Sequence, residues 1–491
     1  MVYIIKKDGT KEEFDANKIK RAVNKSAGRV MYRFTDDEIN FICKYATDRA
    51  EAMSRERKGG KIMIQDMHNI VEGALEQVNP AVAKSYRDYR NYKVDFIHMM
   101  DEVYTKSQSI RYIGDKSNAN TDSALVATKR SLIFNELNKE LYRKFFMNRN
   151  ELQACKDGYI YIHDQSARLD TMNCCLFDVG SVLRGGFEMG NVWYNEPKTL
   201  DTAFDVMGDI ILSTAAQQYG GFTVPEVDKI LSPYAQKSYN KYYEEFLKYS
   251  DPSWEGREEK GRVYAWEKVC RDCDQGWQGI EYKLNTVGSS RGDYQFVTVT
   301  LGLGTGRFEK MISKSLLKVH MGGQGKAGHK KPVLFPKIVF LYDEEIHGDG
   351  KECEDVFEAG VACSAKTMYP DWLSMSGQGY ISSMYKKYKK VISPMGCRAF
   401  LSPWYERGGM EPADENDVPV FVGRFNIGAV SLHLPMILAN ARAENTDFYE
   451  VLDFYLEMIR GLHKRTYDYL GEMRASTNPL ASVRAVSTEA I

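Results

Sequence analysis

The sequence contains no apolar run of the roughly 18 to 20 residues that a membrane-spanning helix needs. Its first residues, MVYIIKKDG, lack the charged region and the long apolar core of a signal peptide. It also has no excess of either charge sign, because 66 Lys and Arg face 67 Asp and Glu. We therefore predict a cytoplasmic protein with no membrane partner and no global basic surface for nucleic acid. The charge balance does not exclude a local phosphate-binding pocket.

The cysteines do not form a disulfide framework. There are nine of them, an odd number spread over a long chain, at positions 43, 155, 174, 175, 270, 273, 353, 363 and 397. Such a pattern is typical of an intracellular protein. Cys270 and Cys273 form a CxxC, but there is no second CxxC and no histidine close by, so neither a zinc site nor a redox pair is predicted.

The length of 491 residues predicts two or more domains, since a single hydrophobic core rarely grows so large. In the central part, apolar strand-like runs alternate with helical patterns, which indicates an α/β architecture. Residues 159–164 and 172–178 are predicted strands, and 335–342 is a predicted strand covered on both faces. Glycine-rich 302–306 and 321–327 lack the spacing of a phosphate-binding P-loop, so we predict ordinary loops there.

Residues 1–95 are predicted to form a compact module. Two short strands are joined by a glycine turn, and helices follow, the first of which opens at Asp15. Lys6, Lys7 and Lys18 lie near this turn and could hold a triphosphate through charge-assisted hydrogen bonds. The alternative is a basic hairpin edge exposed to solvent.

A single cysteine, Cys397, lies in segment 393–401, which has the sequence SPMGCRAFL. Proline fixes its own φ and pushes the preceding residue toward extended geometry, and Gly396 lets the backbone turn tightly. With apolar residues on both sides, this cysteine is predicted to lie at the tip of a loop that enters an apolar interior. The alternative is an ordinary buried cysteine that packs as a small hydrophobe.

Segment 393–401 resembles the finger-loop signature of the anaerobic (class III) ribonucleoside-triphosphate reductases, which are glycyl-radical enzymes. Three further segments resemble this family and lie in the family's order along the chain: one near 285–302, before the finger loop, and two after it, at 423–432 and 475–481. The resemblance implies a ten-stranded α/β barrel with the finger loop through its centre. It also implies reduction of ribonucleoside triphosphates to deoxyribonucleoside triphosphates for DNA precursor synthesis.

The N-terminal module resembles the ATP cone, the allosteric domain of many ribonucleotide reductases. The likeness rests on the spacing of apolar, basic and glycine residues between Ile4 and Ile19. It implies an overall activity switch that ATP turns on and dATP turns off. The effector-binding residues implied by this resemblance are Ile4, Lys6, Lys7, Asp8, Gly9, Lys18 and, near the end of the module, Lys93.

The resemblance also implies catalytic roles. Cys397 would become the thiyl radical that takes a hydrogen atom from C3′ of the ribose, and Cys174 would be the second thiol, on the other face of the sugar. Cys175 is adjacent, but in a strand its side chain would point to the opposite face. Asn426 would hydrogen-bond the sugar or the reductant, which the resemblance implies to be formate. Met395 carries a polarisable thioether and is a candidate modulator of the radical.

Three residues are candidates for the substrate side of this site: His163, Asn173 and Gly396. His163 and Asp164 end a predicted strand, where polar groups could reach a substrate. The alternative for this pair is a turn whose polar groups are satisfied within the protein.

The match departs from the family at two places. His433 stands where the family usually has asparagine. Residues 482–491 do not resemble the family, and neither its C-terminal cysteine-rich zinc site nor its radical glycine is recognisable. We therefore predict an ATP cone at 1–95, a reductase barrel at 96–481 with the finger loop near 391–401, and a C-terminal tail, with no metal ligands assigned.

The resemblance further implies a homodimer and a radical-SAM activase, and we expect a separate C-terminal chain to carry the radical glycine. Two other interpretations stay open. A pyruvate formate-lyase relative would share the barrel but not the ATP cone. Alternatively, the polypeptide only binds nucleotides and has no activity unless a separate C-terminal chain complements it.

Overall fold

The computed structural model describes residues 2–6, 9–30, 32–57, 60–113, 125–286, 292–396 and 398–474, with the backbone alone at 93–95, 112 and 113. Contacts divide the chain into two compact units, Met1–Thr105 and Lys106–Ile491. This boundary falls inside helix α4 (Pro80–Ile113), whereas the predicted boundary at 95/96 stays a prediction. None of the described helices is long and apolar enough to cross a membrane.

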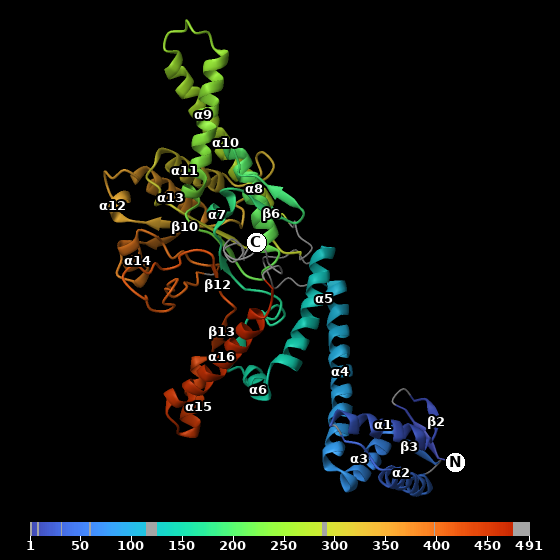
Figure 1. The fold of residues 1–491 in the computed structure, drawn as a ribbon. Helices are drawn as coiled ribbons and strands as arrows, with labels where there is room; N and C mark the ends of the chain where they lie inside the picture. Colours follow the sequence, from blue (N-terminus) through green and yellow to red (C-terminus); the bar gives the residue numbers. More distant parts are fainter. Residues whose placement is uncertain are drawn as a thin grey trace. The chain divides into compact units, whose positions relative to one another are not determined.

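The first unit packs a three-stranded sheet against helices (Figure 1). Its elements are β1 (Tyr3–Ile5), β2 (Lys11–Glu13), α1 (Ala16–Arg29), α2 (Asp36–Glu56), β3 (Lys61–Met63), α3 (Ile64–Val78) and most of α4. β1 is central and pairs antiparallel with β2 and parallel with β3. The predicted helix start is confirmed, because the Asp15 carboxylate accepts a hydrogen bond from the Asn17 N–H at 2.9 Å.

All elements of the first unit except β2 contribute apolar side chains to one core. Ile4 of β1 and Ile62 of β3 are buried with Val23 of α1, Ile42 of α2 and Leu75 of α3. Burial of one such side chain stabilises a fold by about 1.5 to 3 kcal/mol. The unit therefore has a hydrophobic core of its own.

The second unit alternates strands and helices. Before the first strand of its main sheet come α5 (Val126–Leu141), the π-helix η1 (Tyr142–Phe146), α6 (Arg149–Asp157) and β4 (Ile160–Ile162). The elements that follow are β5 (Cys175–Leu176), α7 (Val179–Leu183), β6 (Phe187–Met189), β7 (Val192–Tyr194), α8 (Leu200–Ala215), β8 (Phe222–Val224), α9 (Val227–Tyr249), α10 (Arg257–Leu284), β9 (Val297–Leu301), α11 (Arg307–Gly322), β10 (Lys337–Tyr342), α12 (Glu344–His347) and α13 (Glu354–Thr367). The last elements are β11 (Asp371–Ser374), α14 (Tyr380–Tyr388), β12 (Arg424–Phe425), β13 (Val430–Leu432), α15 (Leu434–Glu444) and α16 (Phe448–Gly471).

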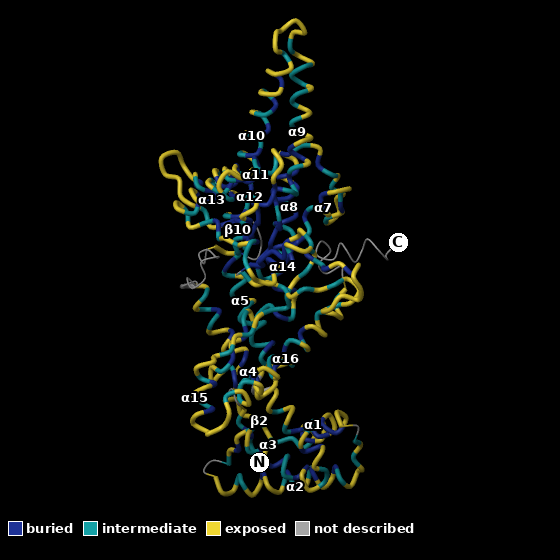
Figure 2. Tube along the Cα trace, turned by 90° about the vertical axis from the view of Figure 1, so that its left-hand side faces the viewer, coloured by how far each residue is buried: buried dark blue, intermediate teal, exposed yellow. Residues whose placement is uncertain are grey.

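Six of these strands form one sheet in the order β11-β10-β9-β8-β5-β12. The first five are mutually parallel, and β12 joins antiparallel to β5. The region around β10 and α8 is coloured mostly as buried in Figure 2, as expected for a parallel sheet covered by helices. The predicted α/β class is confirmed. Because the described strands form this open sheet and smaller pieces, closure into a ten-stranded barrel stays a prediction.

Strand β9 shows how the sheet meets the finger loop, which we define as residues 391–401. Its sequence VTVTL alternates, and Val297, Val299 and Leu301 belong to the large core of the second unit. Side chains of a strand alternate between faces, so the two threonines face the other way. There, Thr300 Oγ1 shares a hydrogen bond of 3.4 Å with Ser393 Oγ of the loop.

Two predicted strands are shorter than expected. Residues 172–178 contain only the two-residue β5, and residues 159–164 contain β4, which pairs with β13 outside the main sheet. Local apolar runs predict extended chain, but ladder length depends on which distant segment lies alongside. The predicted strand at 335–342 is confirmed as β10.

Candidate functional site

The predicted radical cysteine, Cys397, lies outside the described residues, but the finger loop is described on both sides of it. Residues 391–396 are buried throughout. The Met395 N–H donates to the Ala399 carbonyl at 2.8 Å, and the Ala399 N–H donates back at 3.1 Å. The two arms of the loop therefore meet at these residues. The incoming arm, 391–396, is buried as predicted, whereas Ala399 and Phe400 of the outgoing arm are exposed.

Hydroxyl groups of two sheet strands hold the incoming arm of the loop. Thr223 Oγ1 of β8 donates to the Pro394 carbonyl at 3.2 Å, and Thr300 of β9 contacts Ser393. Both threonines are fully buried. Because a buried polar group that loses its partner is costly, these contacts fix the position of the loop on the sheet.

The structure brings Asn173, Cys174 and Asn426 together. The Cys174 N–H donates to Asn426 Oδ1 at 3.2 Å, although the two residues are 252 positions apart in sequence. The Asn426 N–H donates to the Cys174 carbonyl at 3.0 Å, and the Asn173 N–H donates to the Asn426 carbonyl at 3.0 Å. These bonds place the Asn426 side chain beside the backbone of the predicted second thiol.

Two glycines let the loop tip approach this thiol. A Cβ built on Gly396 would lie 3.1 Å from Cys174 Sγ, and a Cβ built on Gly221 would lie 2.5 Å from the Cα of Gly396. Separately, the Gly221 N–H donates to Cys174 Sγ at 3.1 Å. Sequence reasoning missed Gly221. A glycine pair directly before a short apolar strand was the available signal, because glycine permits close backbone approach.

Cys175 meets different surroundings from Cys174. Its Sγ donates to Gln218 Oε1 at 3.0 Å, and it packs in the large core beside Phe222. Burial raises the pKa of the Cys175 thiol well above its usual range, so it stays protonated. The opposite orientations of the two cysteines agree with the choice of Cys174 as the reactive one.

His163 and Met395 are the two remaining candidates. His163 Nε2 is 2.8 Å from Ser431 Oγ, and the His163 N–H donates to the Ala429 carbonyl at 3.2 Å. Met395 is buried with 1% of its surface exposed. His163 therefore contacts β13 and the residue before it, on the same stretch of chain that continues from Asn426.

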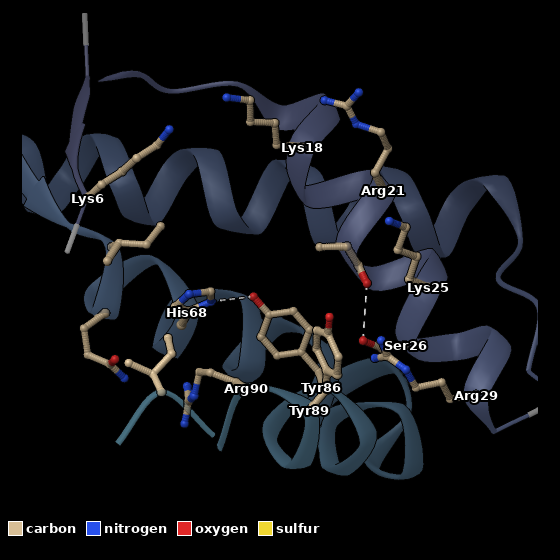
Figure 3. A pocket seen from close by; sticks show the side chains of 14 residues that line it. Lys6, Lys18, Arg21, Lys25, Ser26, Arg29, His68, Tyr86, Tyr89 and Arg90 are labelled. Atoms are coloured by element: carbon tan, nitrogen blue, oxygen red, sulfur yellow. Dashed lines mark hydrogen bonds between the residues drawn. The ribbon is translucent and has the colours of Figure 1, made fainter. Parts of the chain in front are cut away.

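A second site lies in the first unit, where a cavity of about 790 Å³ is lined by cations and aromatic rings (Figure 3). Its cationic side chains are Lys6, Lys18, Arg21, Lys25, Arg29 and Arg90. Lys6 and Lys18, which the sequence proposed, are thus both present. Both also form ion pairs with Glu12, that of Lys6 at 2.8 Å.

The other residues proposed for the effector are placed differently. Lys7, Asp8 and the side chain of Lys93 lie outside the described residues. Gly9 has a φ of 81°, a left-handed conformation that suits glycine in a tight turn. Ile4 does not line the cavity, because it is the middle residue of the central strand and its side chain is buried in the core.

Four of the cations come from one helix, and three of them were missed by sequence reasoning. Lys18, Arg21, Lys25 and Arg29 of α1 follow the spacing that places residues on one helix face. That spacing was the available signal. Such a row of cations can contact several phosphate groups at once.

Aromatic rings give the cavity flat surfaces. Tyr86 Oη lies 2.8 Å from His68 Nδ1, and burial raises the pKa of Tyr86 to about 12. The guanidinium of Arg29 lies 3.7 Å from the centre of the Tyr89 ring. Bases of nucleotides stack on aromatic side chains. Cations together with rings make this cavity suited to a nucleoside triphosphate.

Within the part of the chain that the structure describes, no group of three or more His, Cys, Asp or Glu residues is arranged to hold a metal ion. Cys270 and Cys273, the CxxC pair, both lie on α10 as free thiols.

Known proteins resemble this chain along most of its length. An anaerobic ribonucleoside-triphosphate reductase of Haemophilus influenzae is 32% identical over 461 residues, which cover 92% of this chain and 60% of that protein. An anaerobic ribonucleoside-triphosphate reductase of phage T4 is 36% identical over 324 residues, which cover 65% of this chain and 50% of the phage protein. This chain therefore spans about 60% or less of the length of these two relatives.

A solved structure has a similar fold. The crystal structure of the anaerobic ribonucleotide reductase from Thermotoga maritima with glycerol in its active site matches with a TM-score of 0.53 at 13% identity, over 81% of this chain and 64% of that one. Residues 2–94 match the family model of the ATP cone domain, and residues 117–490 match that of the anaerobic ribonucleoside-triphosphate reductase. The chain therefore belongs to the family of anaerobic ribonucleoside-triphosphate reductases.

Proposed function

We propose that this chain is the nucleotide-reducing part of an anaerobic ribonucleoside-triphosphate reductase that works in the cytoplasm and supplies DNA precursors. The observation that carries the proposal is the convergence of Cys174, Asn426 and the loop tip at Gly396. Family membership supports the same reaction. The match to an ATP cone argues against a pyruvate formate-lyase relative.

The reaction replaces the ribose 2′-hydroxyl by hydrogen. With formate as the reductant, formate is oxidised to CO₂ and supplies two electrons and one hydrogen. One further proton is taken up, and the 2′-oxygen leaves as water. The C3′–H bond is too strong and too weakly acidic for a base, so a thiyl radical at Cys397 takes this hydrogen atom and later returns it.

The other residues bind, orient and donate protons. Cys174 supplies the proton that lets the 2′-hydroxyl leave as water. Asn426 Oδ1 is held by the Cys174 N–H, so the amide N–H groups of Asn426 are directed to the sugar or to formate. Asn173 Oδ1 lies 3.6 Å from Cys174 Sγ and orients that thiol. We assign His163 and Gly396 to the substrate side, and Met395 to modulation of the radical through its thioether.

The oxidising equivalent comes from a glycyl radical. We propose that this radical lies on a C-terminal polypeptide, either joined to this chain or separate, and that a radical-SAM activase installs it. The zinc expected in the family would be held by that polypeptide as well. We further propose that the chain works as a homodimer.

The first unit would act as an activity switch. ATP and dATP would compete for the 790 Å³ cavity, their phosphates on Lys6, Lys18 and the cations of α1 and their bases on the tyrosine rings. We propose that ATP raises turnover and dATP lowers it. The predicted ATP cone at 1–95 and reductase domain at 96–481 are the two parts that this switch would couple.

Anaerobic reduction of CTP and CDP with formate tests the proposal. The chain is assayed alone and then with its activase and a C-terminal polypeptide that carries the radical glycine. Deoxynucleotide formation that is lost in Cys397→Ala and Cys174→Ala, but kept in Cys175→Ala, is the expected result. Cys175→Ala is the matched control, because it removes the neighbouring thiol that faces the core.

No turnover in any combination would contradict the enzymatic proposal. If ATP and dATP still bound the first unit, the chain would be a nucleotide-binding polypeptide without reductase activity. Equal loss of activity in Cys175→Ala would instead contradict the assignment of Cys174 as the reactive thiol.

A further inference from the structure

We propose that Arg398 is a positioning residue that fixes the tip of the finger loop through the carbonyl group of Gly396. The proposal rests on the function proposed above, because it names a residue that orients the same site. Arg398 directly follows Cys397 in the sequence. Its role would be to hold the turn in which that cysteine lies, without contacting the substrate.

One guanidinium group joins three separate parts of the second unit. Nη1 of Arg398 donates to the Gly396 carbonyl at 2.7 Å and to Thr298 Oγ1 of β9 at 3.5 Å. Nε donates to Asp371 Oδ2 of β11 at 2.8 Å, and Nη2 donates to the same oxygen at 2.5 Å. The loop tip is therefore tied to two strands of the sheet by a single side chain.

The backbone at Arg398 has an unusual conformation. Its φ is 76°, in the left-handed region where a residue with a Cβ is strained. The Arg398 N–H donates to the Met395 carbonyl at 2.8 Å, which closes the turn. Glycine would adopt this conformation with less strain, so the arginine side chain is needed for its contacts and not for the turn itself.

The carbonyl that Arg398 holds belongs to the peptide unit leading into Cys397. A peptide unit is planar, so fixing the Gly396 oxygen fixes the plane from which the chain enters residue 397. The same glycine lies against Gly221, and a Cβ on it would be 3.1 Å from Cys174 Sγ. Arg398 therefore sets the orientation of the loop tip relative to the second thiol.

Only arginine suits these contacts. Its planar fork presents donors in fixed directions, so it can bind a carboxylate on one side and a carbonyl on the other. A lysine ammonium could reach Asp371 or Gly396, but it could not hold both in this geometry. Arg398→Lys is therefore expected to behave as a loss of function and not as a conservative change.

The first test measures the exposure of the Cys397 thiol in the full chain under anaerobic conditions. Iodoacetamide labelling is followed by mass spectrometry in the wild type, Arg398→Ala and Asp371→Asn. We expect Cys397 to react about tenfold faster in Arg398→Ala, because loss of a charge-assisted hydrogen bond favours opening of the turn by about that factor. Added guanidinium ion is expected to restore slow labelling of that variant.

Two controls make the result decisive. Arg407→Ala removes an exposed arginine that pairs with Asp414 in the same region, and it should leave labelling of Cys397 unchanged. Cys270 on α10 is the internal control for unfolding. If all cysteines of Arg398→Ala reacted faster, that variant would be unfolded. The labelling rate of Cys397 in Asp371→Asn would then decide the role of Arg398. Unchanged Cys397 labelling in the folded variants would overturn the proposal.

The second test uses the assembled enzyme and separates this proposal from the one on which it rests. We expect kcat of Arg398→Ala to fall about 100-fold with KM for CTP within about threefold, as for displacement of a reacting group by about 1 Å. Wild-type kcat in that variant would overturn the role of Arg398. Absence of turnover in the wild type would overturn the proposed reductase function, and the labelling experiment would still decide the role of Arg398.

Discussion

Asp228 shows how far burial can alter one residue. It lies in the first turn of α9 with no exposed surface. Its Oδ2 accepts hydrogen bonds from the Gly302 N–H at 3.0 Å, the Gly304 N–H at 3.3 Å and Ser313 Oγ at 3.2 Å. Burial raises the pKa of this carboxyl from its usual value near 3.8 to about 6, although the hydrogen bond from the Gly302 N–H opposes the rise. The carboxylate thus orders the glycine-rich loop after β9 at an electrostatic cost.

The stability difference between the wild type and Asp228→Asn is expected to depend on pH. Because the pKa of Asp228 is higher in the folded state, the folded state binds the proton more tightly, and the free energy of unfolding falls as pH rises from 4 to 7. The variant lacks this titration. The stability advantage of the wild type over the variant should therefore shrink by about 2 to 3 kcal/mol over this range.

Urea unfolding at several pH values measures this difference. Asp201→Asn is the matched control, because Asp201 also lies in the first turn of a helix, α8, but is exposed. A wild-type advantage over Asp228→Asn that stays constant or grows with pH would contradict the prediction.

At the level of elements, the approach of the finger loop to strand β8 depends on the absence of a side chain. Gly221 directly precedes β8, and a Cβ there would lie 2.5 Å from the Cα of Gly396 and 2.7 Å from the Phe296 ring. The backbone of the loop and the sheet cannot both keep their places if a methyl group is added. The same close approach is what brings the loop tip to Cys174.

Gly221→Ala is expected to lower the free energy of unfolding by about 1 to 3 kcal/mol, because overpacking forces the loop tip away from the sheet. Gly279→Ala is the matched control. Gly279 lies inside α10 with no atom within 4 Å of an added Cβ, so alanine there should raise stability by about 0.5 to 1 kcal/mol. Chemical denaturation of the wild type and the two variants measures both changes in the free energy of unfolding. If Gly221→Ala left this free energy unchanged, the close approach of the loop to the sheet would be contradicted.

The cations of α1 that line the cavity lie on one face of the helix. Arg21→Ala is expected to weaken ATP binding about tenfold, since a charge-assisted hydrogen bond to phosphate contributes about 1.5 kcal/mol. Lys20→Ala is the control, because Lys20 neighbours Arg21 and is exposed but does not line the cavity. Isothermal titration at two salt concentrations makes the comparison. Equal weakening by both variants would point to a general charge effect and contradict a specific site.

At the level of the whole molecule, the chain consists of two compact units, each with its own core. All lining residues of the cationic cavity belong to the first unit. Its last lining residue, Ile97, lies on α4, which continues across the boundary to Ile113. A fragment that keeps this helix intact therefore contains the complete cavity.

We expect a fragment of residues 1–113 to fold and to bind ATP with a Kd within about threefold of that of the full chain, because an independent core is sufficient for folding. Circular dichroism and isothermal titration measure this. The fragment with Lys6→Ala is the binding control. A folded fragment that does not bind ATP would show that the second unit contributes to the site.

Features that depend on local pattern could be predicted from the amino-acid sequence. The capping residue Asp15 marks a helix start in the structure, and the apolar run at 335–342 forms a buried strand. The motif at the finger loop and the basic N-terminal hairpin indicated the family and two of the cations in the cavity. These signals were readable because helix caps, strand periodicity and turn residues act over a few positions.

The contacts between distant segments follow from how the whole unit packs. Asn426 reaches Cys174 across 252 positions, and Arg398 reaches Asp371 on another strand. The burial of Asp228 and the contact between Gly221 and the loop tip likewise depend on how the strands are ordered in the sheet. Spacing along a chain specifies the face on which a residue lies, but the partner across that face is set by packing of the whole unit.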